Sequence, residues 1–251
     1  KEKHDYVMTV DVARGTAQDY SAFCVFDITE FPYKLVAKYR NNEIKPILFP
    51  NVIYDTARNY NNAHIMTEVN DIGDQVAAIL QFDLEYPNLL MCAMRGRAGQ
   101  IMGSGFSGGK AQLGVKMSKT VKKQGCSNLK ALIEEDKLLI NDYDTIAELT
   151  TFVQKKDSFE ADEGYHDDLV MCHVIFSWMV LQDFFREMTD QDVRKRIYEE
   201  HKNLMEQDMA PFGFIVSADE EETIVDKEGN VWSVDEYGTK QYEVDYMMPY
   251  I

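Results

Sequence analysis

Three acidic residues in unlike contexts carry the chemistry that this sequence most clearly indicates. Asp11 and Glu68 each end a short apolar run, and Asp168 stands directly before the apolar stretch 169–181. Two carboxylates about 4 Å apart repel each other by roughly 4 kcal/mol at an effective dielectric constant of 20. Carboxylates that a fold gathers are therefore best held around a divalent cation, and hard oxygen ligands favour Mg²⁺ or Mn²⁺. We expect Asp11, Glu68 and Asp168 to be metal ligands and catalytic residues.

Three further polar residues flank these acids. Asp19 follows the first turn, and His166 and Asp167 directly precede Asp168. An acid at a helix start is also expected from N-capping and from the helix dipole, and an acid at a strand end can be an ordinary exposed residue. We expect His166 and Asp167 to position water or a phosphate, and Asp19 to give weaker support or only to complete its turn.

The charge of the chain is unevenly distributed. The net charge of −17 argues against uniform attraction to nucleic acid, and sixteen acids stand against six bases after Thr189. The segment 95–130 instead contains eight basic residues and no acid. The segment could be a solvated loop. Its glycines, which let it extend, and its positive charge instead favour one side of a groove that binds the DNA backbone without reading bases. The expected DNA contacts are Arg95, Arg97, Lys110, Lys116, Lys119, Lys122 and Lys123.

Other kinds of site are disfavoured. The segment 103–110 looks like a phosphate-binding loop, but Ser104 occupies its first glycine position and Ala111 replaces the Mg²⁺-binding hydroxyl residue. The four cysteines have no metal-ligand spacing, which favours free thiols in a reducing compartment. Without a signal peptide or an uninterrupted apolar run of about 18 residues, the chain is expected to be neither secreted nor membrane-spanning.

The elements that must position the acids alternate between strands and helices. A three-stranded meander precedes alternating helix and strand, a glycine-rich basic insertion at 95–116, and C-terminal helices. The expected strands are 6–13, 20–28, 34–41, 63–69 and 89–94, and the expected helices are 50–61, 72–84, one or two within 118–138, 145–155, 168–186 and 191–207. The expected helix caps are Asn70-Asp71, Ser127-Asn128 and Asp144.

This order predicts an α/β fold similar to the ribonuclease H-like, resolvase-like class. In that fold a mixed five-stranded sheet carries helices on both faces, with Asp11 and Glu68 at neighbouring strand ends. We expect residues 1–210 to form this domain and residues 211–251 to form an acidic, partly ordered tail.

The chain also resembles the nuclease domain of the terminase large subunit of T-even-type tailed bacteriophages. The matching features are the segment 11–20, Glu68, and the segments 125–130 and 164–171. The resemblance implies a motor that packages viral DNA in the host cytoplasm and cuts the concatemer. It also implies an N-terminal ATPase domain in the same polypeptide, and a portal protein and a small terminase subunit as partners. Its catalytic positions correspond to Asp11, Glu68 and Asp168.

The resulting hypothesis is an endonuclease that hydrolyses double-stranded DNA with two Mg²⁺ or Mn²⁺ ions and little sequence specificity. Asp11 would bridge both ions, and Glu68 and Asp168 would each hold one. Two alternatives stay open: a module that grips DNA without cutting it, and an actin- or hexokinase-like ATPase.

Overall fold

The first apolar runs of the chain form the centre of a mixed sheet. In the computed structural model, the described residues form a five-stranded sheet with the order β4-β1-β2-β3-β8. β1, β2 and β3 are an antiparallel meander, whereas β4 runs parallel to β1 and β8 parallel to β3. The strands are β1 Tyr6–Asp11, β2 Ser21–Asp27, β3 Tyr33–Asn41, β4 His64–Thr67 and β8 Leu138–Leu139. This confirms the predicted meander and the mixed sheet.

The structure describes most of the chain up to residue 189 and three strands beyond it. The described residues are 4–16, 19–69, 72–94, 99–103, 111–155, 158–189, 223–225, 231–234 and 240–242. The chain divides into two compact units, Lys1–Val193 and Arg194–Ile251. The predicted division at residue 210 stays a prediction. The second unit contains β11 Thr223–Val225, β12 Val231–Val234 and β13 Lys240–Tyr242, paired antiparallel in that order.

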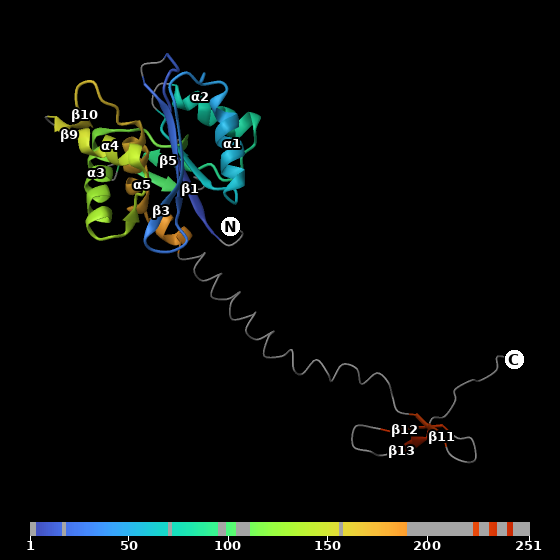
Figure 1. The fold of residues 1–251 in the computed structure, drawn as a ribbon. Coiled ribbons are helices and arrows are strands. Elements are labelled where there is room, and N and C mark those ends of the chain that lie inside the picture. The colour runs from blue at the N-terminus through green and yellow to red at the C-terminus, as the bar shows by residue number, and fades with distance from the viewer. Residues whose placement is uncertain are drawn as a thin grey trace. The chain divides into compact units, whose positions relative to one another are not determined.

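Helices cover both faces of the five-stranded sheet (Figure 1). One face carries α1 Phe49–Asn59 and α2 Gly73–Ala78, which continues as the π-helix η1 Ile79–Asp83. The other face carries α3 Lys119–Glu134, α4 Tyr143–Thr151 and α5 Asp168–Val180. Successive strand residues point to opposite faces, so the strands feed two cores. In β1, Val7 packs into the α5 core and Met8 into the α1 core. Burial on both faces explains the nearly continuous apolar runs.

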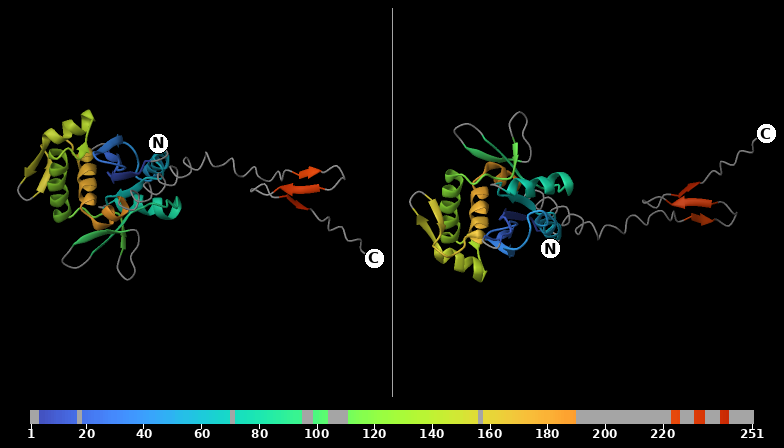
Figure 2. Two further views of the ribbon diagram at one scale, coloured as in Figure 1. Left: turned by 90° about the horizontal axis from the view of Figure 1, so that it is seen from below. Right: turned by 90° about the horizontal axis from the view of Figure 1, so that it is seen from above.

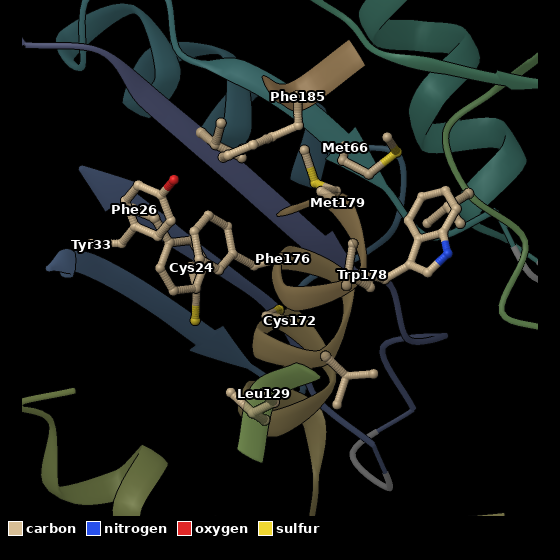
Figure 3. Close-up of a cluster of buried hydrophobic side chains, with 14 of the residues drawn as sticks. Cys24, Phe26, Tyr33, Met66, Leu129, Cys172, Phe176, Trp178, Met179 and Phe185 are labelled. Carbon is tan, nitrogen blue, oxygen red and sulfur yellow. The ribbon is translucent and has the colours of Figure 1, made fainter. Parts of the chain in front are cut away.

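The helix α5 is the central helix of the first unit. Every residue from Asp168 to Met179 is buried, as expected for a helix that is apolar all round. Its Phe176 ring stacks on Phe26 of β2 with ring centroids 4.0 Å apart, and Figure 3 shows this contact within the core. On its outer side, a Cβ atom at Gly125 of α3 would lie 2.4 Å from the Val174 carbonyl oxygen. Glycine thus permits α3 to pack closely against the helix that carries Asp168.

The predicted long helix 168–186 is in fact broken. α5 ends at Val180, and a short helix, Asp183–Thr189, follows at an angle of 81°. Among the described residues, no single helix is long and apolar enough to cross a membrane, and only this bent pair together has the required length and composition.

Two small β-structures accompany the main sheet. The first is a sheet of order β6-β5-β7, in which β6 Gln100–Gly103 and β7 Ala111–Leu113 of the glycine-rich insertion pair with the preceding strand β5 Met91–Met94. The second is a hairpin of β9 Phe152–Lys155 and β10 Ser158–Ala161. Figure 2 shows both projecting from the body of the first unit. The predicted strand 89–94 is present as β5, but it does not join the five-stranded sheet. Leu89 bridges Ile65 of β4, whereas the residues of β5 pair with β6 and β7, and β8 is the fifth strand of the main sheet.

Three local predictions are also corrected. The expected helix 145–155 ends at Thr151, since the following residues pair with β10. Its N-cap is Asp142, whose carboxylate accepts from the Thr145 N–H at 2.9 Å, whereas the expected cap Asp144 lies in the first turn. Residues 119–134 form one helix capped by Ser118, so the expected cap Ser127-Asn128 lies inside it. The expected cap Asn70-Asp71 and the expected helix 191–207 lie outside the described residues.

Candidate metal centre

Asp11 and Glu68 stand side by side at one edge of the sheet. Asp11 is the last residue of β1, and Glu68 directly follows β4. Because these strands are parallel, with Val10 opposite Thr67, their carboxyl ends meet at the same edge. The Glu68 N–H donates to the Val10 carbonyl oxygen at 2.8 Å, which extends the pairing to the acid itself. The strand register thus brings two of the three predicted ligands together.

The position of Glu68 is also set by the segments around it. A Cβ atom at Gly73, the first residue of α2, would lie only 1.9 Å from the Glu68 carbonyl oxygen. On its other side, Glu68 bridges Val115, and the Val69 N–H donates to the Val115 carbonyl oxygen at 2.9 Å. Glycine at position 73 therefore permits a close backbone contact that holds the end of β4.

Asp168 reaches the same part of the molecule as the first residue of α5. This helix packs on β1, where the Thr9 hydroxyl donates to the Cys172 carbonyl oxygen at 2.9 Å, one turn beyond the acid. The Asp168 Oδ1 atom accepts from the Tyr20 N–H at 3.3 Å. Its Oδ2 atom is buried and has no hydrogen-bond partner among the described residues. The third predicted ligand thus keeps one oxygen without a hydrogen-bond donor.

The pKa values of these acids depend on their burial and on the charges around them. Burial raises the pKa of Asp11 well above its ordinary value, and the negative charges of Glu68, Asp168 and Asp167 raise it further. A hydrogen bond between the Asp11 and Glu68 side chains adds to the same effect. Burial also raises the pKa of Asp168, against the opposing charge of Arg40. The charges of Glu68 and Asp168 thus both act on Asp11, and the roles of the three acids as ligands stay a prediction.

Sequence reasoning missed two charged residues beside this group. Arg40 of β3 places its Nη1 atom 3.2 Å from Glu148 Oε1 and its Nη2 atom 3.6 Å from Asp168 Oδ2. Glu148 lies on α4, and its Oε2 atom accepts from the N–H groups of Leu169 and Val170 at 2.8 and 3.1 Å. Burial raises the pKa of Glu148 to about 7, although the amide hydrogen bonds and Arg40 oppose this.

One sequence signal could have pointed to Arg40. Lys38 and Arg40 are two positions apart in the strand predicted at 34–41, so both face the same side of the sheet. Two cations on the side of a strand that faces the core are expected to have acidic partners. The spacing does not say which acids, because Glu148 lies on a helix far away in the chain.

The three supporting residues differ in their environments. His166 Nδ1 lies 3.9 Å from Asp168 Oδ2, and the His166 ring meets the Tyr20 ring edge-on at 5.0 Å. Asp167 Oδ2 accepts from the Ala161 N–H at 3.3 Å, and its charge contributes to the raised pKa of Asp11. Asp19 is exposed, and no hydrogen bond or ion pair joins it to the acids within the described part of the chain. The supporting roles of all three stay predictions.

The basic residues expected to contact DNA are only partly described. Arg95, Arg97 and Lys110 lie outside the described residues. The segment that leads from Lys116 into α3 begins beside the acids, since Val115 pairs with Glu68. Lys119 and Lys123 are exposed on the first turns of α3, and Lys122 lies over the Phe152 ring at 5.8 Å. Their roles in DNA binding stay predictions.

The acidic side chains have the right donor atoms for a divalent cation, but they are not arranged around a common point. Carboxylate oxygens are hard donors, and the buried Asp168 Oδ2 atom has no hydrogen-bond donor among the described residues. Yet among the described side chains, no group of three or more His, Cys, Asp or Glu residues is arranged to hold a metal ion as it stands. The acids are electrostatically coupled, but their oxygens do not converge on one point.

The sheet order, the two helical faces and the acids at the sheet edge define the class of this domain, which is ribonuclease H-like. The family model of the terminase RNaseH-like domain matches residues 8–203, and the chain belongs to that family. This confirms the predicted fold class and the resemblance to terminase large subunits. The narrower assignment to the T-even type stays a prediction.

Solved structures support the same fold. The large terminase nuclease from thermophilic phage G20c with bound magnesium is 22% identical, with a TM-score of 0.52, over 70% of this chain and 82% of that chain. The same nuclease with bound cobalt is 23% identical, with a TM-score of 0.52 and the same coverage. A further structure of this nuclease gives 22% identity and a TM-score of 0.50, again with that coverage.

Proposed function

We propose that this domain is the metal-dependent DNA endonuclease of a viral packaging terminase. One observation carries the proposal: at the edge of a ribonuclease H-like sheet, burial raises the pKa values of Asp11 and Asp168, and the charges of Glu68 and Asp168 raise that of Asp11 further. Such a group is stabilised by divalent cations, which also serve phosphodiester hydrolysis. Membership of the terminase RNaseH-like family supports it, as does the G20c nuclease, which is similar in fold and was solved with magnesium and with cobalt.

The acids would divide the metal-binding work according to their positions. Asp11, which interacts with both other acids, would be shared by two ions, and Glu68 and Asp168 would each hold one. Bound Mg²⁺ or Mn²⁺ would supply water activation and stabilisation of charge on the leaving oxygen. His166 and Asp167, which flank Asp168, would orient water or the phosphate.

The DNA backbone would run along the basic segment that begins beside Glu68. Lys116, Lys119, Lys122 and Lys123 follow within eight residues of Val115, and they contact phosphates rather than bases in this proposal. With about five phosphate contacts from the whole segment, log K would fall with log salt at a slope near −4 to −5. Cutting would then show little sequence preference.

Nicking of supercoiled plasmid by the purified chain tests the proposal. The expected result is cleavage with Mg²⁺ or Mn²⁺, none with EDTA, and none by folded Asp168→Asn protein. Full cleavage in EDTA, or by folded Asp168→Asn protein, contradicts the metal-dependent mechanism.

The exposed lysines of α3 also favour a second candidate, a DNA-gripping module, since they would serve translocation equally well. DNA binding at low salt without cleavage in any divalent metal would support gripping. Measurable ATP binding by the isolated chain would instead support the ATPase alternative.

The remaining parts of the proposal follow from the family. The domain would act with an ATPase domain of the same polypeptide, a portal protein and a small terminase subunit, in the host cytoplasm during assembly. Co-purification of the full-length polypeptide with portal protein tests the assembly.

A further inference from the structure

Arg40 occupies a defined place in the row of residues that holds the acids. Across the sheet, Asp11 stands opposite Ala22, and Ala22 stands opposite Arg40. Residues opposite one another in a sheet point to the same face, here the face covered by α5. The fully buried Ala22 has only a methyl side chain. The start of α5 with Asp168 can therefore lie over the row between Asp11 and Arg40.

The Arg40 guanidinium is held from several sides. It lies over the Tyr20 ring at 3.9 Å, pairs with Glu148 at 3.2 Å, and approaches Asp168 Oδ2 at 3.6 Å. Tyr20 also donates its N–H to Asp168 Oδ1. The planar fork of the guanidinium can serve two carboxylates at fixed angles, which an ammonium group cannot.

Glu148 connects the same guanidinium to the backbone of α5. The first N–H groups of a helix have no partner within the helix and need an external acceptor. The N-cap residue Asp167 makes no side-chain capping bond. Glu148 instead accepts from the N–H groups of Leu169 and Val170, so a side chain of α4 caps α5. The residue it fixes in space is Asp168, which immediately precedes these amides.

We propose that Arg40 and Glu148 are positioning residues that hold the start of α5 so that Asp168 faces Asp11 and Glu68. This inference rests on the proposed function, because it assigns Asp168 to metal binding. Arg40 restrains the carboxylate of Asp168, and Glu148 restrains its backbone. Outer residues that orient metal ligands typically contribute 10- to 100-fold to metal affinity.

A competing role for Arg40 would be direct contact with DNA phosphate. Its two acidic neighbours and the ring of Tyr20 occupy the guanidinium, which disfavours that role. The two roles make different kinetic predictions. A positioning residue affects kcat and metal affinity, whereas a phosphate contact affects KM for DNA and the salt slope.

Mn²⁺ titration calorimetry and plasmid-nicking kinetics on the full chain test the proposal with four variants. Glu148→Ala and Arg40→Ala should weaken Mn²⁺ binding and lower kcat about 10- to 100-fold, with KM for DNA and the salt slope unchanged. Glu148→Gln keeps an oxygen that can accept from the α5 amides and should recover part of the loss. Arg40→Lys keeps the charge without the fork and should recover less.

Lys38→Ala is the matched control. Lys38 is two residues from Arg40 on the same strand, and it also pairs with acids. Its partners, Asp142 and Asp144, lie near the start of α4, whereas Arg40 pairs with Asp168, the first residue of α5. Loss of Lys38 should lower stability and leave Mn²⁺ affinity unchanged within about twofold, below the 10-fold expected for an orienting residue.

Three results would overturn the proposal. The first is unchanged Mn²⁺ affinity and kcat in folded Glu148→Ala and Arg40→Ala proteins, or, if these do not fold, in folded Arg40→Lys protein, while the wild type binds Mn²⁺ and cuts DNA. The second is an equal loss of Mn²⁺ affinity in Lys38→Ala, which would indicate general destabilisation. The third is a raised KM with a shallower salt slope in Arg40→Lys, which would indicate DNA contact. A wild-type chain that neither binds Mn²⁺ nor cuts DNA overturns the proposed function together with this inference.

Discussion

Two groups of acidic residues lie on the α5 side of the sheet and differ in their charge balance. At the start of α4, Lys38 is 2.6 Å from Asp142 and 2.5 Å from Asp144. Burial alone would raise the pKa of Asp142, but hydrogen bonds from Lys38 and Thr145 outweigh it, and the pKa is lowered. At the sheet edge, burial and neighbouring acids raise the pKa of Asp11. Interactions with Lys38 and Thr145 thus outweigh burial at Asp142 in the first group, whereas burial and neighbouring acids prevail at Asp11 in the second.

The difference separates a structural ion pair from a site that needs a ligand. The balanced group, Lys38 with Asp142 and Asp144, joins β3 to the start of α4, and Lys38 helps to keep the pKa of Asp142 low. In the sheet-edge group, the Arg40 guanidinium opposes the shift of Asp168, but the pKa values of Asp11 and Asp168 both stay raised. A divalent cation would stabilise this group. Four predictions test whether this contrast is real, beginning with the largest expected effect.

Removing one charge from each group should have very different consequences for catalysis. Asp11→Asn should lower metal-dependent DNA cleavage roughly 1000-fold, equivalent to about 4 kcal/mol of lost transition-state stabilisation. Asp144→Asn makes the same chemical change in the balanced group and should leave the rate unchanged. The measurement is single-turnover nicking of plasmid with Mn²⁺, with folding checked by circular dichroism. Equal losses in both variants would remove the distinction.

The same substitution should stabilise the metal-free protein near neutral pH. The pKa of Asp11 lies above its ordinary value of 3.8, so its ionisation in the folded state costs stability. This cost is absent below about pH 3.8 and grows as the pH rises through the folded pKa. Asp11→Asn should therefore gain about 1–2 kcal/mol at pH 7, the scale of relieving an unpaired buried polar group, and nothing at acid pH.

Urea unfolding in EDTA across this pH range measures the gain. Mn²⁺ at 100 times its Kd should in turn stabilise the wild type by about 2.7 kcal/mol and the variant far less. A variant less stable than the wild type at pH 7 would contradict the sign of the Asp11 shift.

Crowding the backbone beside Glu68 should damage the site more than equal crowding elsewhere. In Gly73→Ala, the new Cβ must move away from the Glu68 carbonyl oxygen, which should cost about 1–3 kcal/mol and displace the acid. Gly125→Ala crowds the Val174 carbonyl oxygen instead and should cost similar stability. Mn²⁺ affinity of the folded fraction distinguishes them. It should fall in Gly73→Ala only, and an equal fall in both would assign the effect to loosened packing.

The smallest effect is expected in the balanced group. Asp142→Ala removes the N-cap of α4 and the partner of Lys38, which should cost about 1 kcal/mol at pH 7. Since the pKa of Asp142 is lowered, its charge contributes stability above its ordinary value of 3.8, and this is lost as the pH falls through the folded pKa. Asp142→Asn keeps a capping oxygen and should lose less. Urea midpoints at pH 7 and pH 3 measure both variants, and a deficit that grows toward pH 3 would contradict the ion pair.

Local sequence patterns predicted the meander, the strand that precedes Glu68 and the helix that begins at Asp168. They failed where a partner distant in the chain decides the outcome. Residues 152–155 continue a helical pattern but pair with β10, and Leu138–Leu139 is too short to be recognised as a strand without β3 beside it. Asp144 and Asp142 are both plausible caps, and only the backbone geometry of α4 selects Asp142.

Hydrophobic periodicity and chain breaks are local properties, so the amino-acid sequence alone shows which acids end the apolar strands and which acid begins the apolar helix. The folded structure is needed to see that the charges of Glu68 and Asp168 act on Asp11, and that Arg40 and Glu148 lie beside Asp168. The reason is physical: a pKa shift depends on burial and on charges within a few ångströms, and long-range packing brings these together from distant parts of the chain.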